Sequence, residues 1–242
     1  MRYILYLLLF ATAAFSENLV LEAEAEDTVS NVVLDHYLSS LQEQHVSPRE
    51  VSMEVEIKAE LPSIGKSGTL RALRSISRLG QITYKALTFQ GDSTIKKDVI
   101  ARYMTAEIEA ATKGDIGITR ENYKFKYYGV YGNGDWRLHL YEMSPRQKRL
   151  GLFQGWVWLE AKTGLPVREQ GELVKNPSVF LKKVTFLRDY EIKDGLAFPV
   201  KIESSVDTRL VGRAEVVIHY ANYSKAQDDL TKVVAWLAAG HR

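Results

Sequence analysis

The sequence predicts a mainly β protein of the α+β class, built from about ten sequential antiparallel strands. Through most of the chain, apolar and polar residues alternate at period two, which is typical of half-buried strands. Helical spacing appears in one segment before the strands, one after the third strand and one at the end. Strands and helices do not alternate regularly, so a parallel doubly wound sheet is not expected.

The N-terminal segment differs from the rest in composition. Met1–Ser16 combines an early positive charge at Arg2, an apolar run over Ile4–Phe10, and small residues at the −3 and −1 positions of a cleavage site. This pattern is typical of a secretory signal peptide and is too short for a membrane span. The alternatives are a buried N-terminal strand or an uncleaved anchor. We expect Glu17–Arg242 to form a single exported domain, with no transmembrane span after signal cleavage.

The first half of the mature chain predicts a helix, three strands and a second helix. Val29–Leu41 has apolar residues at three-and-four spacing and is followed by Pro48, so it predicts an amphipathic helix. The expected strands are Val51–Lys58, Ser67–Ser77 and Gly80–Gln90. Thr94–Thr112 returns to helical spacing, and its apolar stripe consists of Val99, Ile100, Tyr103, Met104 and Ile108.

The second half predicts a series of hairpins. Gly132-Asn133-Gly134-Asp135 separates the strands Tyr123–Tyr131 and Trp136–Met143, a strong hairpin signal. A second hairpin joins Leu152–Glu160 to Leu165–Val174 through a turn at Gly164, which can adopt a positive φ. The remaining expected elements are the strands Val179–Ile192, Ala197–Val206 and Gly212–Tyr223, and a closing amphipathic helix over Gln227–Ala239.

The strand Leu152–Glu160 carries bulky residues on both of its faces. Phe153, Val157 and Leu159 point to one side of the strand, whereas Leu152, Trp156 and Trp158 point to the other. A sheet that is apolar on both faces must cover both of them, and the predicted helices are the available cover.

Composition excludes several classes of function. The chain has 242 residues, no cysteine and a net charge of +2, which gives neither a thiolate metal site nor a disulfide framework nor a nucleic-acid footprint. The five histidines lack metal-site spacing, and no motif of a hydrolase or metalloprotease is present. We therefore expect a protein that is not an enzyme and has no catalytic residues, metal or cofactor.

The densest basic cluster is Pro145-Arg146-Gln147-Lys148-Arg149. It has two interpretations, contact with anionic lipid head groups or an ordinary solvated loop between strands.

A family resemblance rests on the second hairpin and the strands after it. Gly155-Trp156-Val157-Trp158-Leu159-Glu160, followed by Thr163-Gly164-Leu165-Pro166-Val167, resembles the corresponding hairpin of periplasmic LolA-like proteins, the outer-membrane lipoprotein-sorting superfamily. The downstream residues that resemble the following strands of that family are Phe180, Val184, Phe186, Tyr190, Gly195, Phe198, Pro199, Gly212, Ala214, Glu215 and Tyr220.

The resemblance implies a curved antiparallel half-barrel whose concave face is covered by the N-terminal, inserted and C-terminal helices. Founding members of this family carry lipoproteins between membranes, and relatives bind glycolipids or sense envelope stress. The implied protein is periplasmic in a Gram-negative bacterium and binds or carries a lipid, the acyl chains of a lipoprotein or another amphiphile. An envelope sensor or interaction module that docks another cell-envelope protein is the alternative, and an enzyme is less favoured.

The predicted ligand-binding residues are those expected to line the cavity of such a half-barrel. They are Trp156, Trp158, Leu138, Val99, Tyr103 and Ile108. The alternative is that these residues fill the core between the helices and the sheet and contact no ligand.

Overall fold

The computed structural model describes residues 28–43, 51–77, 81–112, 117–134, 136–176, 181–209 and 212–225. The predicted signal peptide (Met1–Ser16) and closing helix (Gln227–Ala239) lie outside these ranges.

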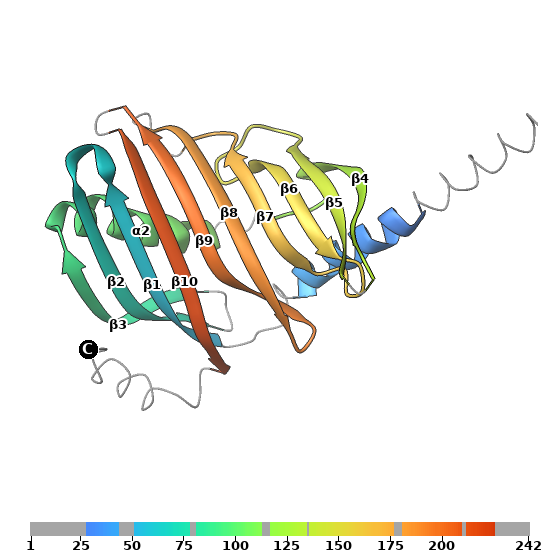
Figure 1. The fold of residues 1–242 in the computed structure, drawn as a ribbon, viewed down its shortest axis with the longest axis horizontal. Helices are drawn as coiled ribbons and strands as arrows, with labels where there is room; N and C mark the ends of the chain where they lie inside the picture. The colour runs from blue at the N-terminus through green and yellow to red at the C-terminus, as the bar shows by residue number, and fades with distance from the viewer. Residues whose placement is uncertain are drawn as a thin grey trace, which may run out of the picture.

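Ten antiparallel strands form one open sheet (Figure 1). The strands are β1 (Val51–Leu61), β2 (Lys66–Ile76), β3 (Ile82–Gly91), β4 (Tyr123–Asn133), β5 (Trp136–Pro145), β6 (Phe153–Glu160), β7 (Pro166–Leu173), β8 (Leu181–Lys193), β9 (Leu196–Thr208) and β10 (Arg213–Lys225). These bounds differ from the predicted ones by only a few residues. The prediction of a mainly β fold with about ten antiparallel strands is confirmed.

The strands follow the order β3-β2-β1-β10-β9-β8-β7-β6-β5-β4. Every neighbouring pair except one is also consecutive in the sequence. The exception is β1 and β10, which pair in the interior of the sheet, with Ile57 opposite Ile218. Because β3 and β4 end the order at opposite edges, the sheet is a curved half-barrel and not a closed one.

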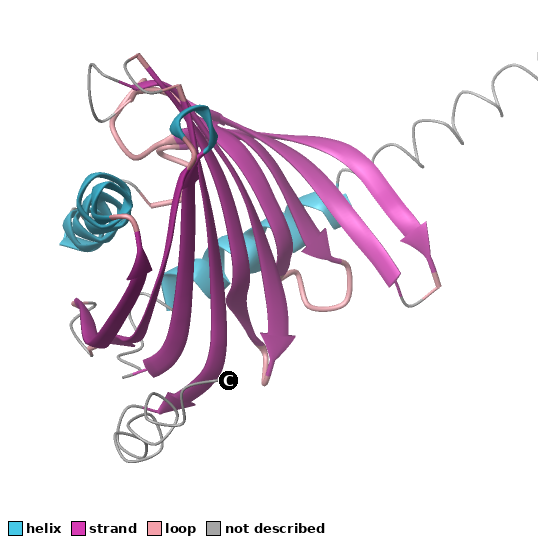
Figure 2. Ribbon diagram, turned by 60° about the vertical axis from the view of Figure 1, so that its left-hand side comes forward, coloured by secondary structure: helices cyan, strands magenta, loops and turns pink. Residues whose placement is uncertain are grey.

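Two helical segments lie on the same face of this sheet (Figures 1 and 2). The first is the helix over residues 28–43, which lies behind β4–β8 in the view of Figure 1. The second begins as a π-helical turn (Ile95–Ile100) and continues as α2 (Ala101–Thr112), so the predicted helix Thr94–Thr112 has two geometries. We call the face that bears these helices the inner face and the opposite face the outer face. No helix among the described residues is long and apolar enough to cross a membrane.

The inner face carries two separate apolar clusters. The first cluster lies beneath α2 and consists of buried residues of β1, β2, β9 and β10 together with Ile95 and Ile100. The second cluster lies beneath the helix over residues 28–43 and consists of Val33, Leu34, Tyr37, Tyr123, Tyr141, Met143, Leu152, Phe153, Val157 and Leu159. Each helix therefore buries its apolar stripe against its own part of the sheet.

Strand register shows what separates the two clusters. A row of directly opposed residues crosses the inner face from β1 to β5: Ile57, Ile218, Ile202, Arg188, Glu169, Val157 and Tyr141. The first three belong to the first cluster and the last two to the second. The two residues between the clusters are an arginine and a glutamate.

Candidate functional site

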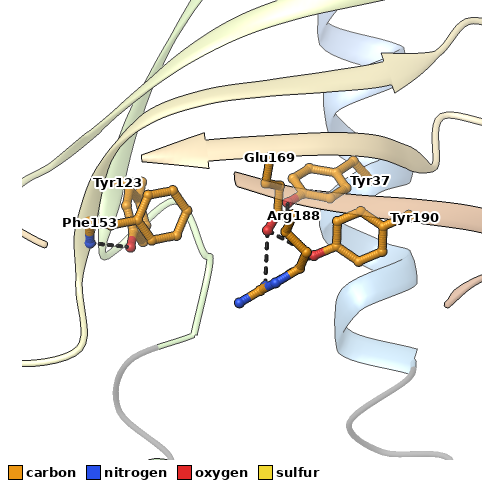
Figure 3. A network of polar contacts seen from close by, with 6 residues as sticks. All are labelled: Tyr37, Tyr123, Phe153, Glu169, Arg188 and Tyr190. Atoms are coloured by element: carbon orange, nitrogen blue, oxygen red, sulfur yellow. Dashed lines mark hydrogen bonds and ion pairs between the residues drawn. The ribbon is translucent and has the colours of Figure 1, made fainter. Parts of the chain in front are cut away.

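The charged pair between the clusters is the centre of a polar network (Figure 3). Glu169 of β7 is only 1% exposed, and its carboxylate accepts hydrogen bonds from three donors. The Tyr37 hydroxyl donates to Oε1 over 2.9 Å, the Tyr190 hydroxyl donates to Oε2 over 2.8 Å, and Nη1 of Arg188 donates to Oε2 over 3.1 Å. Three donors and a compensating charge satisfy a carboxylate that burial would otherwise penalise strongly.

The two tyrosines of this network stay protonated and act as hydrogen-bond donors. Burial raises the pKa of the Tyr37 and Tyr190 hydroxyls above the ordinary value, so both keep their protons at neutral pH. Because Tyr37 lies on the helix over residues 28–43, its hydrogen bond also fixes this helix to the sheet. A second contact does the same, since the Tyr141 hydroxyl donates to the backbone carbonyl of Ser30 over 2.6 Å.

The hydrogen bonds of Arg188 in β8 all use one terminal nitrogen of its guanidinium. Nη1 contacts Glu169 and also donates to the Tyr190 hydroxyl over 3.1 Å, and the guanidinium carbon lies 5.5 Å from the centre of the Phe186 ring. Within the described residues, no hydrogen bond from Nη2 is found, and Nε is buried without a partner. The side chain lies deep among protein atoms, yet 34% of its surface remains accessible.

Apolar side chains continue around this arginine. Phe186 precedes Arg188 on the same face of β8 and packs against the second cluster, whereas Val206 of β9 packs against the first. Both side chains are only partly buried, as is Val184, which lies directly opposite Val206. The strip of sheet between the two helices is therefore a partly exposed apolar surface with one cation in it.

A second polar network fixes α2 to the sheet. Nη2 of Arg74, a buried residue of β2, donates to Glu107 of α2 over 2.8 Å, and the Tyr84 hydroxyl of β3 donates to the other Glu107 oxygen. The guanidinium also lies 5.9 Å from the ring centre of Tyr220 in β10. Each helix thus has an apolar stripe and buried polar contacts that anchor it to the sheet.

The structure divides the six predicted site residues between the two faces. Val99 and Tyr103 pack beside the first cluster on the inner face, whereas Ile108 is 38% exposed. Leu138, Trp156 and Trp158 share the outer face, because their strand neighbours Val157 and Leu159 point inward. The two sets do not converge on one cavity, and contact of any of them with a ligand stays a prediction.

Trp156 lines a groove of 760 Å³ on the outer face of β5–β10. Its ring stacks edge-on against Tyr128, with the ring centres 4.8 Å apart. The groove has both polar and apolar lining, and its charged residues are Glu142, Glu172, Glu203, Glu215 and Lys183. The excess of glutamates suits a positively charged partner.

The basic cluster that follows β5 has structural contacts. Arg146 donates through Nε to the carbonyl of Arg120 over 2.9 Å, and Arg149 donates to the side-chain oxygen of Asn122. These contacts agree with a loop that is ordered by its own chain. Contact of this cluster with anionic lipid stays a prediction.

Sequence reasoning missed Glu169 and Arg188 as site residues. The available signal was on β8, where Arg188 falls on the same face as Val184 and Phe186 and interrupts an apolar row. Among the described residues, no group of three or more His, Cys, Asp or Glu side chains could hold a metal ion.

Comparison with known proteins finds similar solved structures. No family model and no curated protein matches the sequence. Three similar solved structures are a DUF1329 family protein from Desulfovibrio piger, a LolA superfamily protein from Nitrosomonas europaea and an outer membrane lipoprotein-sorting protein domain from Vibrio parahaemolyticus.

Their sequence identities are 10%, 12% and 11%, and their TM-scores are 0.42, 0.40 and 0.43. The matches cover 84%, 81% and 89% of this chain, and 94%, 94% and 99% of the solved chains. Two of the three are LolA-like, the family that the hairpin motif resembles. Similarity at this level assigns no function and identifies no ligand.

Proposed function

We propose that this protein is an exported, periplasmic protein that binds or carries an amphiphile: a lipid, or the acyl chains of a lipoprotein. The observation that carries the proposal is the partly exposed apolar strip of β8 and β9 between two separately anchored helices. An acyl chain placed there would extend the apolar contacts of both clusters.

The free energy gained by burying an acyl chain in such a site is large. Burying apolar surface contributes roughly 0.8 kcal/mol for each CH₂ group, so a chain of about 14 carbons crosses an aqueous compartment too slowly without a carrier. Apolar contacts are also non-directional, which allows chains of different length to bind the same strip.

The test is lipid retention and uptake. Protein purified without detergent is expected to show added lipid mass in native mass spectrometry. Protein from which bound lipid has been removed is expected to take up a fluorescent fatty acid. Protein that carries no lipid and enhances no probe fluorescence would contradict the proposal.

An interaction module is the second candidate, and the acidic residues of the outer-face groove favour it. Four glutamates and one lysine line this groove, which is complementary to a basic segment of a partner protein. Reversing two of these charges, with Glu203→Lys and Glu215→Lys, is expected to abolish partner capture from an envelope extract. The control is Glu191→Lys, an exposed position that does not line the groove. Equal capture by all variants would exclude the groove as the docking surface.

A further inference from the structure

The guanidinium of Arg188 has one terminal nitrogen occupied and the other accessible. Its contacts with Glu169 and Tyr190 both use Nη1, while Nη2 and Nε make no hydrogen bond to the described residues. Figure 3 shows the terminal nitrogen outside the network pointing away from Glu169 and Tyr190. Because Nε is buried, Nη2 is the nitrogen whose N–H groups can reach a carboxylate or a phosphate.

The position of Nη2 suits the head group of an amphiphile. Arg188 lies between Ile202 of the first cluster and Glu169, which is followed across the sheet by Val157 of the second cluster, and the half-buried Phe186 ring lies beside it. A third of its side chain remains accessible although it is recessed among protein atoms. An anion that reaches it therefore has apolar surface on both sides.

The neighbouring glutamate does not cancel this cation for an incoming ligand. Glu169 is 1% exposed, and its two oxygens are already occupied by the Tyr37 and Tyr190 hydroxyls and by Nη1. These donors disperse the negative charge and hold the carboxylate on the far side of the guanidinium. Nη2 thus keeps N–H donors that the Glu169 carboxylate does not use.

We propose that Nη2 of Arg188 binds the oxyanion head group of the amphiphile, while its apolar chain lies along the strip between the two helices. This inference rests on the proposed function and narrows it to acidic amphiphiles. Fatty acids and phosphate-bearing lipids share this chemistry, and neutral lipids lack it.

The test compares ligands with one chain and different head groups. A fluorescent probe is bound to delipidated full-length protein and displaced by each of three ligands: hexadecyl phosphate, palmitate and hexadecanol. Wild-type protein is expected to bind both anions at least about tenfold more tightly than hexadecanol, because a charge-assisted hydrogen bond is lost with the alcohol. Preference for only one of the anions would identify the head group.

One variant keeps the Arg188 cation, and the other leaves the buried network neutral. Glu169→Gln retains the cation and is expected to keep the preference for anions. The double variant Glu169→Gln/Arg188→Gln removes both charges and is expected to bind the three ligands about equally, with hexadecanol affinity unchanged. The matched control is Arg168→Gln/Asp189→Asn, which removes a pair joined over 2.7 Å across the same two strands on the outer face.

Each outcome is decisive. A double variant that still prefers anions, or wild-type protein that binds all three ligands equally, would overturn the head-group site and leave the proposed function standing. Wild-type protein that binds none of the three, hexadecanol included, would overturn the proposed function itself.

Discussion

The charges buried on the inner face occur in pairs, each supplemented by tyrosine hydroxyls. Glu169 is paired with Arg188, and Glu107 is paired with Arg74, which is itself only 8% exposed. Buried ion pairs do not necessarily stabilise a fold relative to apolar residues, but removing one partner leaves an uncompensated charge and is costly. Here each pair helps to fix the position of one helix on the sheet. Tyr37 of the first helix binds Glu169, and Glu107 of α2 binds Arg74.

The hydroxyl of Tyr37 should contribute measurably to stability. Replacing Tyr37 by Phe keeps the ring in the second cluster and removes one of three donors to Glu169. The free energy of unfolding is expected to fall by about 1–2 kcal/mol in urea titrations, since a hydrogen bond to a buried charge is lost. Tyr128→Phe, at a 41% exposed tyrosine, is the control and should change it by less than about 0.5 kcal/mol. An equal change in the free energy of unfolding for both variants would show that the hydrogen bond to Glu169 adds no more stability than an exposed hydroxyl does.

His139 should make stability depend on pH. It is 4% exposed, its Nδ1 lies 3.0 Å from the Tyr127 hydroxyl, and burial, together with Arg137, lowers its pKa below the ordinary 6.5. The unfolded chain therefore binds this proton more readily than the folded one. The stabilising contribution is complete above pH 6.5 and is lost as the pH falls through and below that value.

The check is the slope of unfolding free energy against pH. We expect His139→Gln to have a shallower slope than wild type just below pH 6.5. His219→Gln replaces an exposed histidine of β10 and should keep the wild-type slope. Identical slopes for all three proteins would assign the pH dependence to other groups.

At the scale of elements, α2 depends on one buried anchor. Glu107→Ala leaves Arg74 buried without its partner and removes the acceptor of the Tyr84 hydroxyl. We expect a loss of about 3 kcal/mol in the free energy of unfolding and faster amide exchange within α2. Exchange in the helix over residues 28–43 should not change, because that helix is anchored separately through Tyr37.

Arg102→Ala is the matched control within α2. Arg102 is exposed and its pair with Asp98 spans 3.3 Å, so its removal is expected to cost less than about 0.5 kcal/mol. Faster exchange of both helices in Glu107→Ala would instead indicate that the two anchors are coupled.

The elements themselves could be predicted from local patterns. Alternation at period two, glycine-rich turns and helical stripes are all contained within short windows, which is why the strand bounds were close. The face that each strand turns toward the helices is not local information. Both faces of β6 are apolar, so Trp156 and Trp158 were equally plausible as inward residues until register placed Val157 opposite Tyr141.

The polar network was unpredictable for the same reason. Glu169 lies between Arg168 and Gln170, which locally indicates a solvated strand. Its burial depends on Tyr37, which is 132 residues away in sequence, and on Tyr190 from the next strand. A helical stripe explains why Tyr37 is buried but says nothing of the partner for its hydroxyl.

At the scale of the whole molecule, two clusters share one sheet. β8 and β9 connect them, since Phe186 packs against the second cluster while Ile202 belongs to the first. Continuous pairing from β3 to β4 argues that both halves unfold together. Ile218→Ala removes part of a side chain from the middle of the first cluster. Its effect on the other half of the sheet can be followed because Trp136, Trp156 and Trp158 all lie on β5 and β6.

In a Trp236→Phe background, tryptophan fluorescence reports on the β5–β6 side alone. Ile218→Ala is expected to cost roughly 3 kcal/mol and to shift the urea midpoints of fluorescence and circular dichroism equally. A shift confined to circular dichroism would mean that the clusters unfold as separate units.

The interior position of β10 has a consequence for the order in which the protein is made. β1, β2 and β3 leave the ribosome long before β10, yet one side of β1 has its backbone partner only in β10. Throughout synthesis of the intervening strands, β1 presents an unpaired edge that could join another nascent chain. A chaperone that covers residues 51–61 until the last strand arrives would therefore raise the yield of native protein.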